Sequence, residues 1–235
     1  MNTIFDFFLQ TLQTEYDQLR VIKESERGTV ILLRHKQTGQ RYVFRRFHGS
    51  PQVYQALLHI DCPHLPQIIE VAEKDGEVLV LEEFIPGDTL SYVLQGDVLS
   101  AKQTRKIGRQ ICRALWVLHG IGVVHRDVKP ENIILRGKEV VLIDFDASRI
   151  QKPAEVEDTQ ILGTTGYAAP EQYGLSQTDG RADIYSMGVL LNVLRTGYHP
   201  SQKLAKWRLG RIIQKCTMVA PDKRYQTIRA LMEVL

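Results

Sequence analysis

The sequence predicts an α+β chain in two parts, a small antiparallel β-sheet with one helix followed by a larger, mainly helical region. Residues 20–47 alternate between apolar and polar side chains and are rich in β-branched and aromatic types, which is typical of strands. Residues 100–120 and 180–197 carry apolar side chains at helical spacing. Pro86-Gly87 marks the change of character between the two parts.

The composition indicates an ordinary globular protein. The chain has 235 residues, of which 43% are hydrophobic and 24% charged. Its net charge of +3 comes from 30 basic and 27 acidic residues, a balance that gives no reason to expect nucleic-acid binding. The three cysteines, Cys62, Cys112 and Cys216, lie far apart and form no metal-binding spacing. We therefore expect free thiols in a reducing, cytoplasmic compartment.

The first 19 residues are expected to form an N-terminal helix. Ile4, Phe8 and Leu12 recur at helical spacing, which favours a helix packed on the rest of the protein. A helix that binds a partner or a membrane surface is the alternative. The apolar run is short, is interrupted by Asp6 and has no basic leader, so it is a poor signal peptide. No stretch of the sequence approaches the ~18 apolar residues that predict a membrane span.

The region 20–85 reads as a sheet with one helix. After the first strands, Pro51 opens a short predicted helix over 51–60. Two further strands are predicted over 67–73 and 77–84, joined by an Asp-Gly pair that suits a type I′ turn.

The region 86–235 reads as mainly helical. Ser100 and Gln103 form a predicted capping box at the start of a long helix that Gly120 ends. A hairpin is predicted over 133–143. A second buried helix ends at Gly197, and two more helical segments follow from about residue 204.

The candidate catalytic motif is H-R-D-V-K-P-E-N at 125–132. It is followed, after the predicted hairpin, by D-F-D at 144–146. Asp127 and Asn132 lie on one loop, and Asp144 lies at the end of the adjacent strand. Carboxylate and amide oxygens are ligands for Mg²⁺, and a further carboxylate can orient an attacking hydroxyl. With the cation of Lys129, this set suits the transfer of a phosphoryl group.

Here the sequence resembles the eukaryotic-type serine/threonine protein kinases, and its P-E-Q-Y-G run is similar to bacterial, Hanks-type members. The resemblance covers roughly residues 20–230 and implies a two-lobe protein-kinase-like fold that uses ATP and Mg²⁺. It implies that Asp127 is the catalytic base and that Lys129 steadies the γ-phosphate. Asn132 and Asp144 would hold Mg²⁺.

Further motifs agree with the resemblance. The string G-T-T-G-Y-A-A-P-E at 163–171 is similar to the end of a kinase activation segment. The resemblance implies that Glu171 pairs with Arg224 and that Asp183 braces the catalytic loop. It also implies that Thr164 contacts the catalytic aspartate and lysine, which favours serine or threonine as the acceptor.

The sequence allows two modes of regulation of the activation segment, with and without phosphorylation. Thr159 is the favoured phosphorylation candidate, because Thr164 is committed to the active site. Arg126, which precedes the catalytic aspartate, is a potential docking group for a phosphothreonine. The alternative is an activation segment that is ordered without phosphate.

The glycine-rich loop departs from the family pattern. When the sequence is aligned on Val30, only Gly28 remains of the usual glycines, and Lys23 and Ser25 stand where two others would be. The D-F-G motif reads D-F-D, with Asp146 in place of the glycine, and Asp tolerates left-handed backbone better than most residues.

The strand lysine is replaced as well. Its position is taken by Arg45, and the helix at 51–60 contains no acidic residue to pair with it. Matching Glu83 to Ile85 with the segment that binds adenine puts Glu82 at the gatekeeper position. Our hypothesis is that an Arg45–Glu82 pair replaces the usual Lys–Glu pair. The alternative is a slip in the alignment that leaves Glu82 exposed at the end of its strand.

Three functions compete on these grounds. The first is an active kinase that phosphorylates serine or threonine on a protein substrate. The second is a pseudokinase that binds nucleotide weakly or not at all and acts on a regulatory protein partner. The third is a small-molecule phosphotransferase of related fold, against which the A-P-E and K-P-E-N strings argue.

Overall fold

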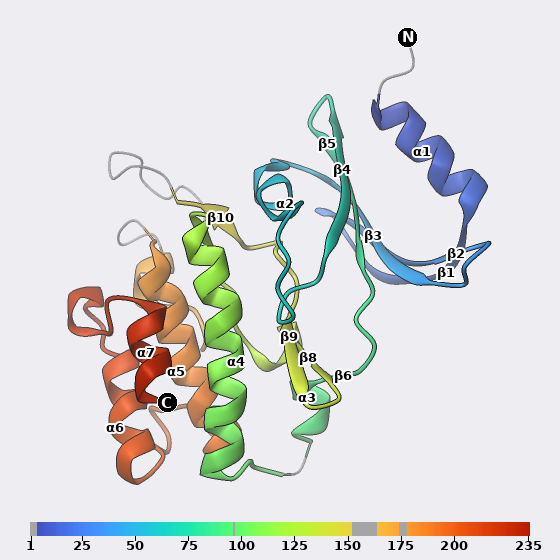
Figure 1. The fold of residues 1–235 in the computed structure, drawn as a ribbon. Helices are drawn as coiled ribbons and strands as arrows, with labels where there is room; N and C mark the ends of the chain where they lie inside the picture. The colour runs from blue at the N-terminus through green and yellow to red at the C-terminus, as the bar shows by residue number, and fades with distance from the viewer. Residues whose placement is uncertain (1–3, 96, 152–163, 174–177) are drawn as a thin grey trace. The chain divides into compact units, whose positions relative to one another are not determined.

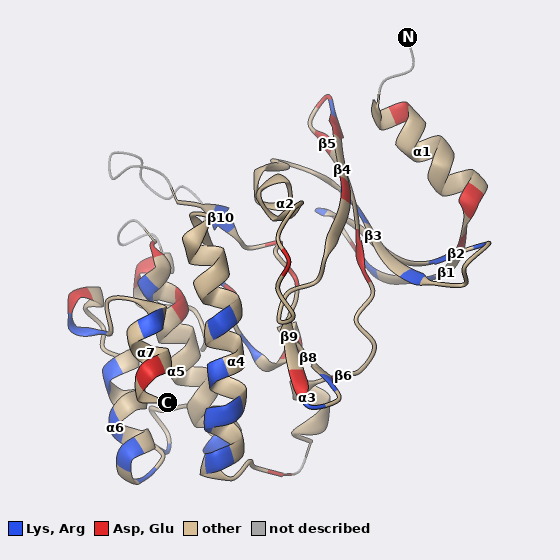
Figure 2. Ribbon diagram, viewed as in Figure 1, with Lys and Arg blue, Asp and Glu red and all other residues tan. Residues whose placement is uncertain are grey.

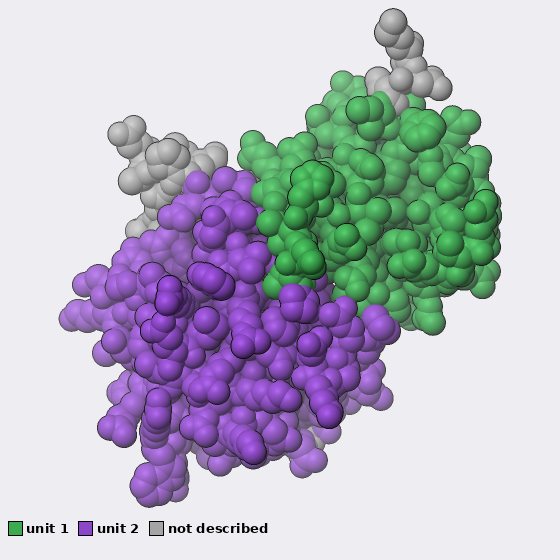
Figure 3. All heavy atoms as spheres, viewed as in Figure 1, with its two compact units in different colours: residues 1–62, 66–85 green, residues 63–65, 86–235 purple. Residues whose placement is uncertain are grey.

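The computed structural model describes residues 4–95, 97–151, 164–173 and 178–235 (Figure 1). The chain divides into two compact units, one of residues 1–62 with 66–85 and one of residues 63–65 with 86–235 (Figure 3). Within the described ranges, no helix combines the length and the apolar character needed to cross a bilayer.

The first unit is built on a five-stranded antiparallel sheet in the order β1-β2-β3-β5-β4. Its strands are β1 (Tyr16–Ser25), β2 (Gly28–His35), β3 (Arg41–His48), β4 (Ile68–Lys74) and β5 (Glu77–Glu83). Asp75 and Gly76 between β4 and β5 have φ angles of 54° and 79°, as the predicted type I′ turn requires.

The N-terminal helix is shorter than expected. Helix α1 spans Ile4–Glu15, and β1 begins directly at Tyr16. The expectation of helix through residue 19 is therefore wrong. The ring of Tyr16 packs edge-on against His35 and Tyr42, with centroids 5.0 and 5.7 Å apart. These contacts with the neighbouring strands outweigh the helical spacing of the apolar residues.

The two faces of the sheet are covered by different helices. Phe8 of α1 packs edge-on against Phe44, with ring centroids 6.4 Å apart, and joins a core of buried residues on that face. Side chains alternate between faces along a strand, so Phe47 of β3 points the other way. It contacts Tyr54 of α2 (Gln52–Leu57), with centroids 5.7 Å apart. The sheet thus has α1 on one face and α2 on the other.

The second unit is mainly helical. Its helices are α3 (Leu90–Val93), α4 (Ala101–Gly120), α5 (Gly180–Thr196), α6 (Trp207–Cys216) and α7 (Ile228–Val234). The predicted capping box opens α4, with the side chain of Ser100 accepting from the backbone N–H of Gln103. Helix α5 ends at Thr196 and is capped by Gly197, whose left-handed φ of 75° is the conformation that favours glycine after a helix.

Short strands and single turns of 3₁₀ helix connect the helices of this unit. The strands are β6 (Asp88–Thr89), β7 (Val123–Val124), β8 (Ile133–Arg136), β9 (Glu139–Leu142) and β10 (Arg149–Ile150). Strands β6, β8 and β9 form one small sheet, and β7 pairs with β10. The predicted hairpin over 133–143 is therefore present as β8 and β9.

The packing of α1 is tested by a matched pair of substitutions. Phe8 is 6% exposed and its neighbour Phe7 is 68% exposed. We expect Phe8→Ala to reduce the free energy of unfolding of the first unit by ~3–5 kcal/mol, because it leaves a cavity in the core. Phe7→Ala should change it by less than about 0.5 kcal/mol. Denaturant titrations that show equal effects would contradict the packing of α1 on the sheet.

Candidate active site

The side chains of Asp127, Lys129 and Thr164 form a closed hydrogen-bonded triangle. Lys129 Nζ lies 2.7 Å from Asp127 Oδ2 and donates to Thr164 Oγ1 at 2.6 Å. The Thr164 hydroxyl donates in turn to Asp127 Oδ1 at 2.7 Å. The hydroxyl therefore uses its one proton on the carboxylate and a lone pair on the ammonium. This triangle fixes the direction of the Asp127 carboxylate.

Asn132 holds the same carboxylate from a third side. It lies at the end of a 3₁₀ turn, η1 (Pro130–Asn132), and its Nδ2 donates to Oδ2 and to the backbone carbonyl of Asp127, both at 2.9 Å. This orients the amide so that its oxygen faces away from Asp127. The backbone N–H of Ile143 donates to the carbonyl of Asn132 at 2.9 Å, which ties the strand leading to Asp144 to the catalytic loop.

Asp144 itself is the strained residue of the D-F-D motif. Its φ is 67°, in the left-handed region that a non-glycine residue enters at a cost of ~1–3 kcal/mol. Its Oδ1 accepts from the backbone N–H of Asp146 at 3.3 Å. Asp146 is not among the residues with positive φ. The tolerance of Asp for left-handed backbone is therefore used at Asp144 and not at Asp146.

The electrostatic state of Asp127 follows from these contacts. Burial by itself raises the pKa of the Asp127 carboxyl. The hydrogen bonds from Lys129, Thr164 and Asn132, together with the charge of Lys129, outweigh burial and hold the pKa below its ordinary value. Asp127 is therefore ionised at neutral pH and can accept a proton.

The loop that carries Asp127 is held from beneath by Asp183 of α5, which is fully buried. Its carboxylate accepts from the backbone N–H groups of His125 and Arg126 at 2.9 and 2.7 Å, and lies 2.8 Å from His119 Nε2. Burial alone would raise the pKa of Asp183. The hydrogen bond and charge of His119, with the contribution of His125, lower it below its usual range.

A buried ion pair anchors the end of the activation segment. Arg224 donates two parallel hydrogen bonds to the carboxylate of Glu171, at 2.6 and 2.8 Å. Its three remaining N–H groups donate to the backbone carbonyls of Arg181, Met218 and Val219. All five donors of the guanidinium are satisfied, which compensates for its removal from water.

In the first unit, Arg45 and Glu82 form a buried ion pair. Arg45 Nε donates to Glu82 Oε1 at 2.8 Å, and the two residues are 7% and 4% exposed. Strand register explains the contact. Arg45 lies opposite Val80 and Glu82 lies opposite Val43, so the two side chains are diagonal neighbours on one face of the sheet. The hypothesised contact is present, and Glu82 is not exposed at a strand end.

Gly28 has a structural reason to be glycine. Its φ is 150°, and a Cβ on this residue would clash with the backbone carbonyl of Arg46 on β3. Among the other residues expected at the nucleotide, Val30 and Ile85 are buried. Glu83 is half-buried, and its carboxylate accepts from the backbone N–H of Gln67 at 3.2 Å.

The sequence of this chain matches a known protein family. A family model described as the protein kinase domain matches residues 16–233. The chain belongs to the protein kinase family. Testis-specific serine/threonine-protein kinase 3 of Mus musculus is 34% identical over 176 residues, which cover 73% of this chain. The match spans 65% of that relative's length.

Other curated kinases are similar over comparable lengths. Mitogen-activated protein kinase kinase 9 of Arabidopsis thaliana is 30% identical over 203 residues, covering 79% of this chain and 65% of the relative. A bacterial protein, serine/threonine-protein kinase pkn2 of Myxococcus xanthus, is 29% identical over 177 residues, covering 72% of this chain and 21% of the relative.

The predicted regulatory roles of Thr159 and Arg126 stay predictions. Thr159 lies outside the described residues. Arg126, its expected partner, is 3% exposed and has a φ of 68°. One residue that the motifs missed is Gln172, which accepts from the backbone N–H of Ala169 and donates to the carbonyl of Arg126 at 2.8 Å. It lies within the P-E-Q-Y-G string, whose resemblance to other members was the available signal.

The role of Asp183 predicts a characteristic pH dependence. Its folded pKa is below the unfolded value of about 3.9, so its stabilisation is fully present above that pH and is lost as the pH falls through the folded pKa. We expect Asp183→Asn to destabilise the kinase domain by about 3–5 kcal/mol at pH 7. The difference in Tm from the unmodified protein should shrink below about pH 4.

Thermal unfolding measured between pH 3 and 8 tests this, with the exposed Asp222→Asn as the control. A difference in Tm that stays constant over the whole range would contradict an ionised Asp183.

Proposed function

We propose that this kinase domain transfers the γ-phosphate of ATP to serine or threonine hydroxyls of protein substrates. The observation that carries the proposal is the triangle of Asp127, Lys129 and Thr164. It provides an ionised base, a cation next to it, and a threonine that holds both. This arrangement suits general-base assistance to a hydroxyl nucleophile.

Each of these residues has a distinct role in the proposal. Asp127 orients the substrate hydroxyl and accepts its proton, since its lowered pKa keeps it ionised. Lys129 provides positive charge where negative charge develops on the transferred group. Thr164 links the activation segment to the base, so the position of that segment affects the direction of the Asp127 carboxylate.

The donor set on the catalytic loop fits Mg²⁺. Asn132 offers an amide oxygen and Asp144 a carboxylate, both of the hard-oxygen type that this cation binds. No cluster of three His, Cys, Asp or Glu residues suited to a metal occurs in the described part of the chain. Mg²⁺ with ATP takes few protein ligands, because phosphate and water oxygens fill the remaining positions. When bound, the ion neutralises charge on the phosphates.

The first unit provides the proposed nucleotide contacts. Arg45, held by Glu82, would present its guanidinium to the phosphates in place of the usual lysine. Gly28 and Val30 belong to the loop that is proposed to cover the nucleotide. Glu83 and Ile85 belong to the segment that is proposed to bind adenine. The short distance from Arg45 Nε to Glu82 Oε1, 2.8 Å, supports the proposal that Glu82 orients the guanidinium.

The cellular setting is part of the proposal. The sequence similarity of the P-E-Q-Y-G string suggests a bacterial kinase, and we propose Thr159 as its regulatory phosphorylation site. Cys62, Cys112 and Cys216 are free thiols, which supports a reducing, cytoplasmic compartment.

Phosphate transfer is tested by incubating the protein with Mg-ATP and a generic basic protein and measuring intact masses. We expect phosphate incorporation that falls by ~10²–10⁴-fold in Asp127→Asn, because the base is lost. Asp61→Asn, an exposed residue of the first unit, is the matched control and should leave transfer unchanged.

Two outcomes would contradict the proposal. Absence of transfer, with thermal stabilisation by nucleotide retained, would identify a nucleotide-binding pseudokinase. Transfer that persists in Asp127→Asn would exclude Asp127 as the base.

A further inference from the structure

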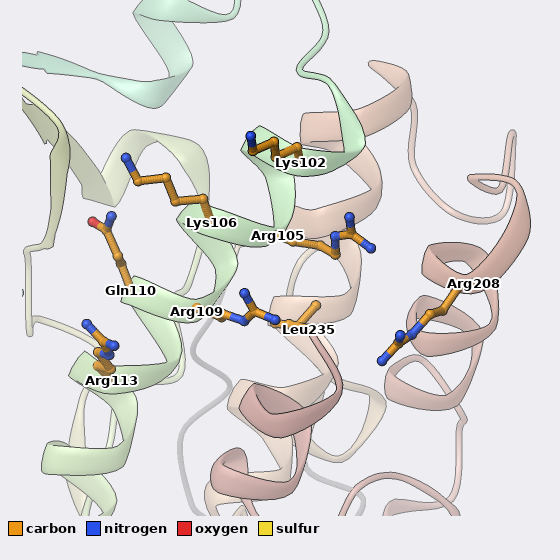
Figure 4. A pocket seen from close by; sticks show the side chains of 8 residues that line it. All are labelled: Lys102, Arg105, Lys106, Arg109, Gln110, Arg113, Arg208 and Leu235. Atoms are coloured by element: carbon orange, nitrogen blue, oxygen red, sulfur yellow. The ribbon is translucent and has the colours of Figure 1, made fainter.

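A groove lined by cations lies on the second unit, formed by α4 and α6. It encloses about 580 Å³ and is lined by Gln110, Leu235 and six basic residues. We call it the α4–α6 basic groove, and its basic residues are Lys102, Arg105, Lys106, Arg109, Arg113 and Arg208. Arg105 and Arg109 extend from α4 toward Arg208, which reaches back from α6 (Figure 4).

The charge of the groove is not balanced locally. Helix α4 contains five Lys or Arg residues and no Asp or Glu, and Figure 2 shows its basic bands without an acidic one. Within the described ranges, none of the six basic side chains of the groove forms an ion pair with a carboxylate, and no acidic residue lines it. Six like charges held together favour binding of an anionic ligand.

The spacing of the cations suits an extended chain. Lys102, Lys106, Arg109 and Arg113 recur once per helical turn, so successive charges are about 5.4 Å apart along α4. Side chains on one side of an extended peptide recur about every 6.6 Å. From Lys102 to Arg113 the helix rises about 16 Å, which corresponds to about five residues of extended chain.

Both tryptophans of the chain lie close in sequence to these cations. Trp116 follows Arg113 by one turn of α4 and is 52% exposed. Trp207 precedes Arg208 and is 88% exposed, with a left-handed φ of 63° that is unfavourable for a bulky residue. Exposed tryptophan beside arginine is typical of protein–protein interfaces, where these two residue types are enriched.

We propose that the α4–α6 basic groove binds an extended acidic segment of a partner protein. A lipid bilayer is flat and does not reach the inside of a hollow. The protein as a whole carries a net charge of only +3, which gives little long-range attraction to a polyanion such as nucleic acid. A short acidic peptide meets the local charge and fits the hollow. The proposal is independent of phosphoryl transfer.

The test measures binding of a fluorescein-labelled peptide of five Ser-Glu repeats to the full chain, without nucleotide, by fluorescence anisotropy. A Ser-Gln peptide of equal length is the uncharged control. We expect binding of the Ser-Glu peptide alone, accompanied by a change in tryptophan emission. The affinity should fall on raising the salt concentration, because the contacts are solvent-exposed charges.

Charge reversal locates the site. Arg105→Glu with Arg109→Glu should weaken binding about tenfold or more. Arg20→Glu with Lys223→Glu changes the net charge equally at exposed positions outside the groove, and should alter affinity by less than about twofold. If the first pair unfolds the protein, Lys106→Gln with Arg113→Gln replaces it, and should also weaken binding.

Three outcomes would overturn the proposal. The first is equal weakening by the groove and control pairs, which would mean diffuse electrostatic attraction. The second is tighter binding to vesicles of phosphatidylserine and phosphatidylcholine than to the peptide, which would identify a membrane surface. The third is preferential binding of a single-stranded oligonucleotide, which would identify a nucleic-acid site.

Discussion

The buried carboxylate of Asp183 is the constraint on which the catalytic loop depends. It comes from the first turn of α5, where it is fully buried, so its position is fixed by the core of the second unit. The loop contributes two backbone N–H groups, from His125 and Arg126, that this carboxylate satisfies. Arg126 is held in a left-handed conformation there. The backbone that leads into Asp127 and Lys129 therefore has a fixed direction.

In the first unit, the central ion pair is Arg45–Glu82. Kinases of the common pattern connect a strand lysine to a helix glutamate, and this chain has neither. Arg45 and Glu82 instead belong to adjacent strands of one sheet, so their contact follows from strand register and needs no particular position of α2. Removing either partner would leave a buried charge. A guanidinium held in this way keeps its planar orientation as well as its charge.

Much of this arrangement could be predicted from the sequence, because its signals are local. The capping box of α4, the Asp75-Gly76 turn and the catalytic string each fix structure within a few residues. The end of α1 could not be predicted, because contacts of Tyr16 with two other strands decide it. The bridging role of Gln172 could not be predicted either, because its hydrogen bond to the Arg126 carbonyl joins segments 46 residues apart. The contact of Arg45 with Glu82 could be hypothesised because the family resemblance places Glu82 at the gatekeeper position, close to the strand that carries Arg45.

The proposed role of the Arg45–Glu82 pair is tested most directly by steady-state kinetics of Arg45→Lys with MgATP. Arg46→Lys is the matched control, because Arg46 is adjacent on β3, points to the opposite face and has a half-exposed side chain. If the phosphates are held by the guanidinium that Glu82 orients, kcat/KM for MgATP should fall about tenfold or more in Arg45→Lys alone. An unchanged or higher kcat/KM in Arg45→Lys would contradict a site built around this arginine.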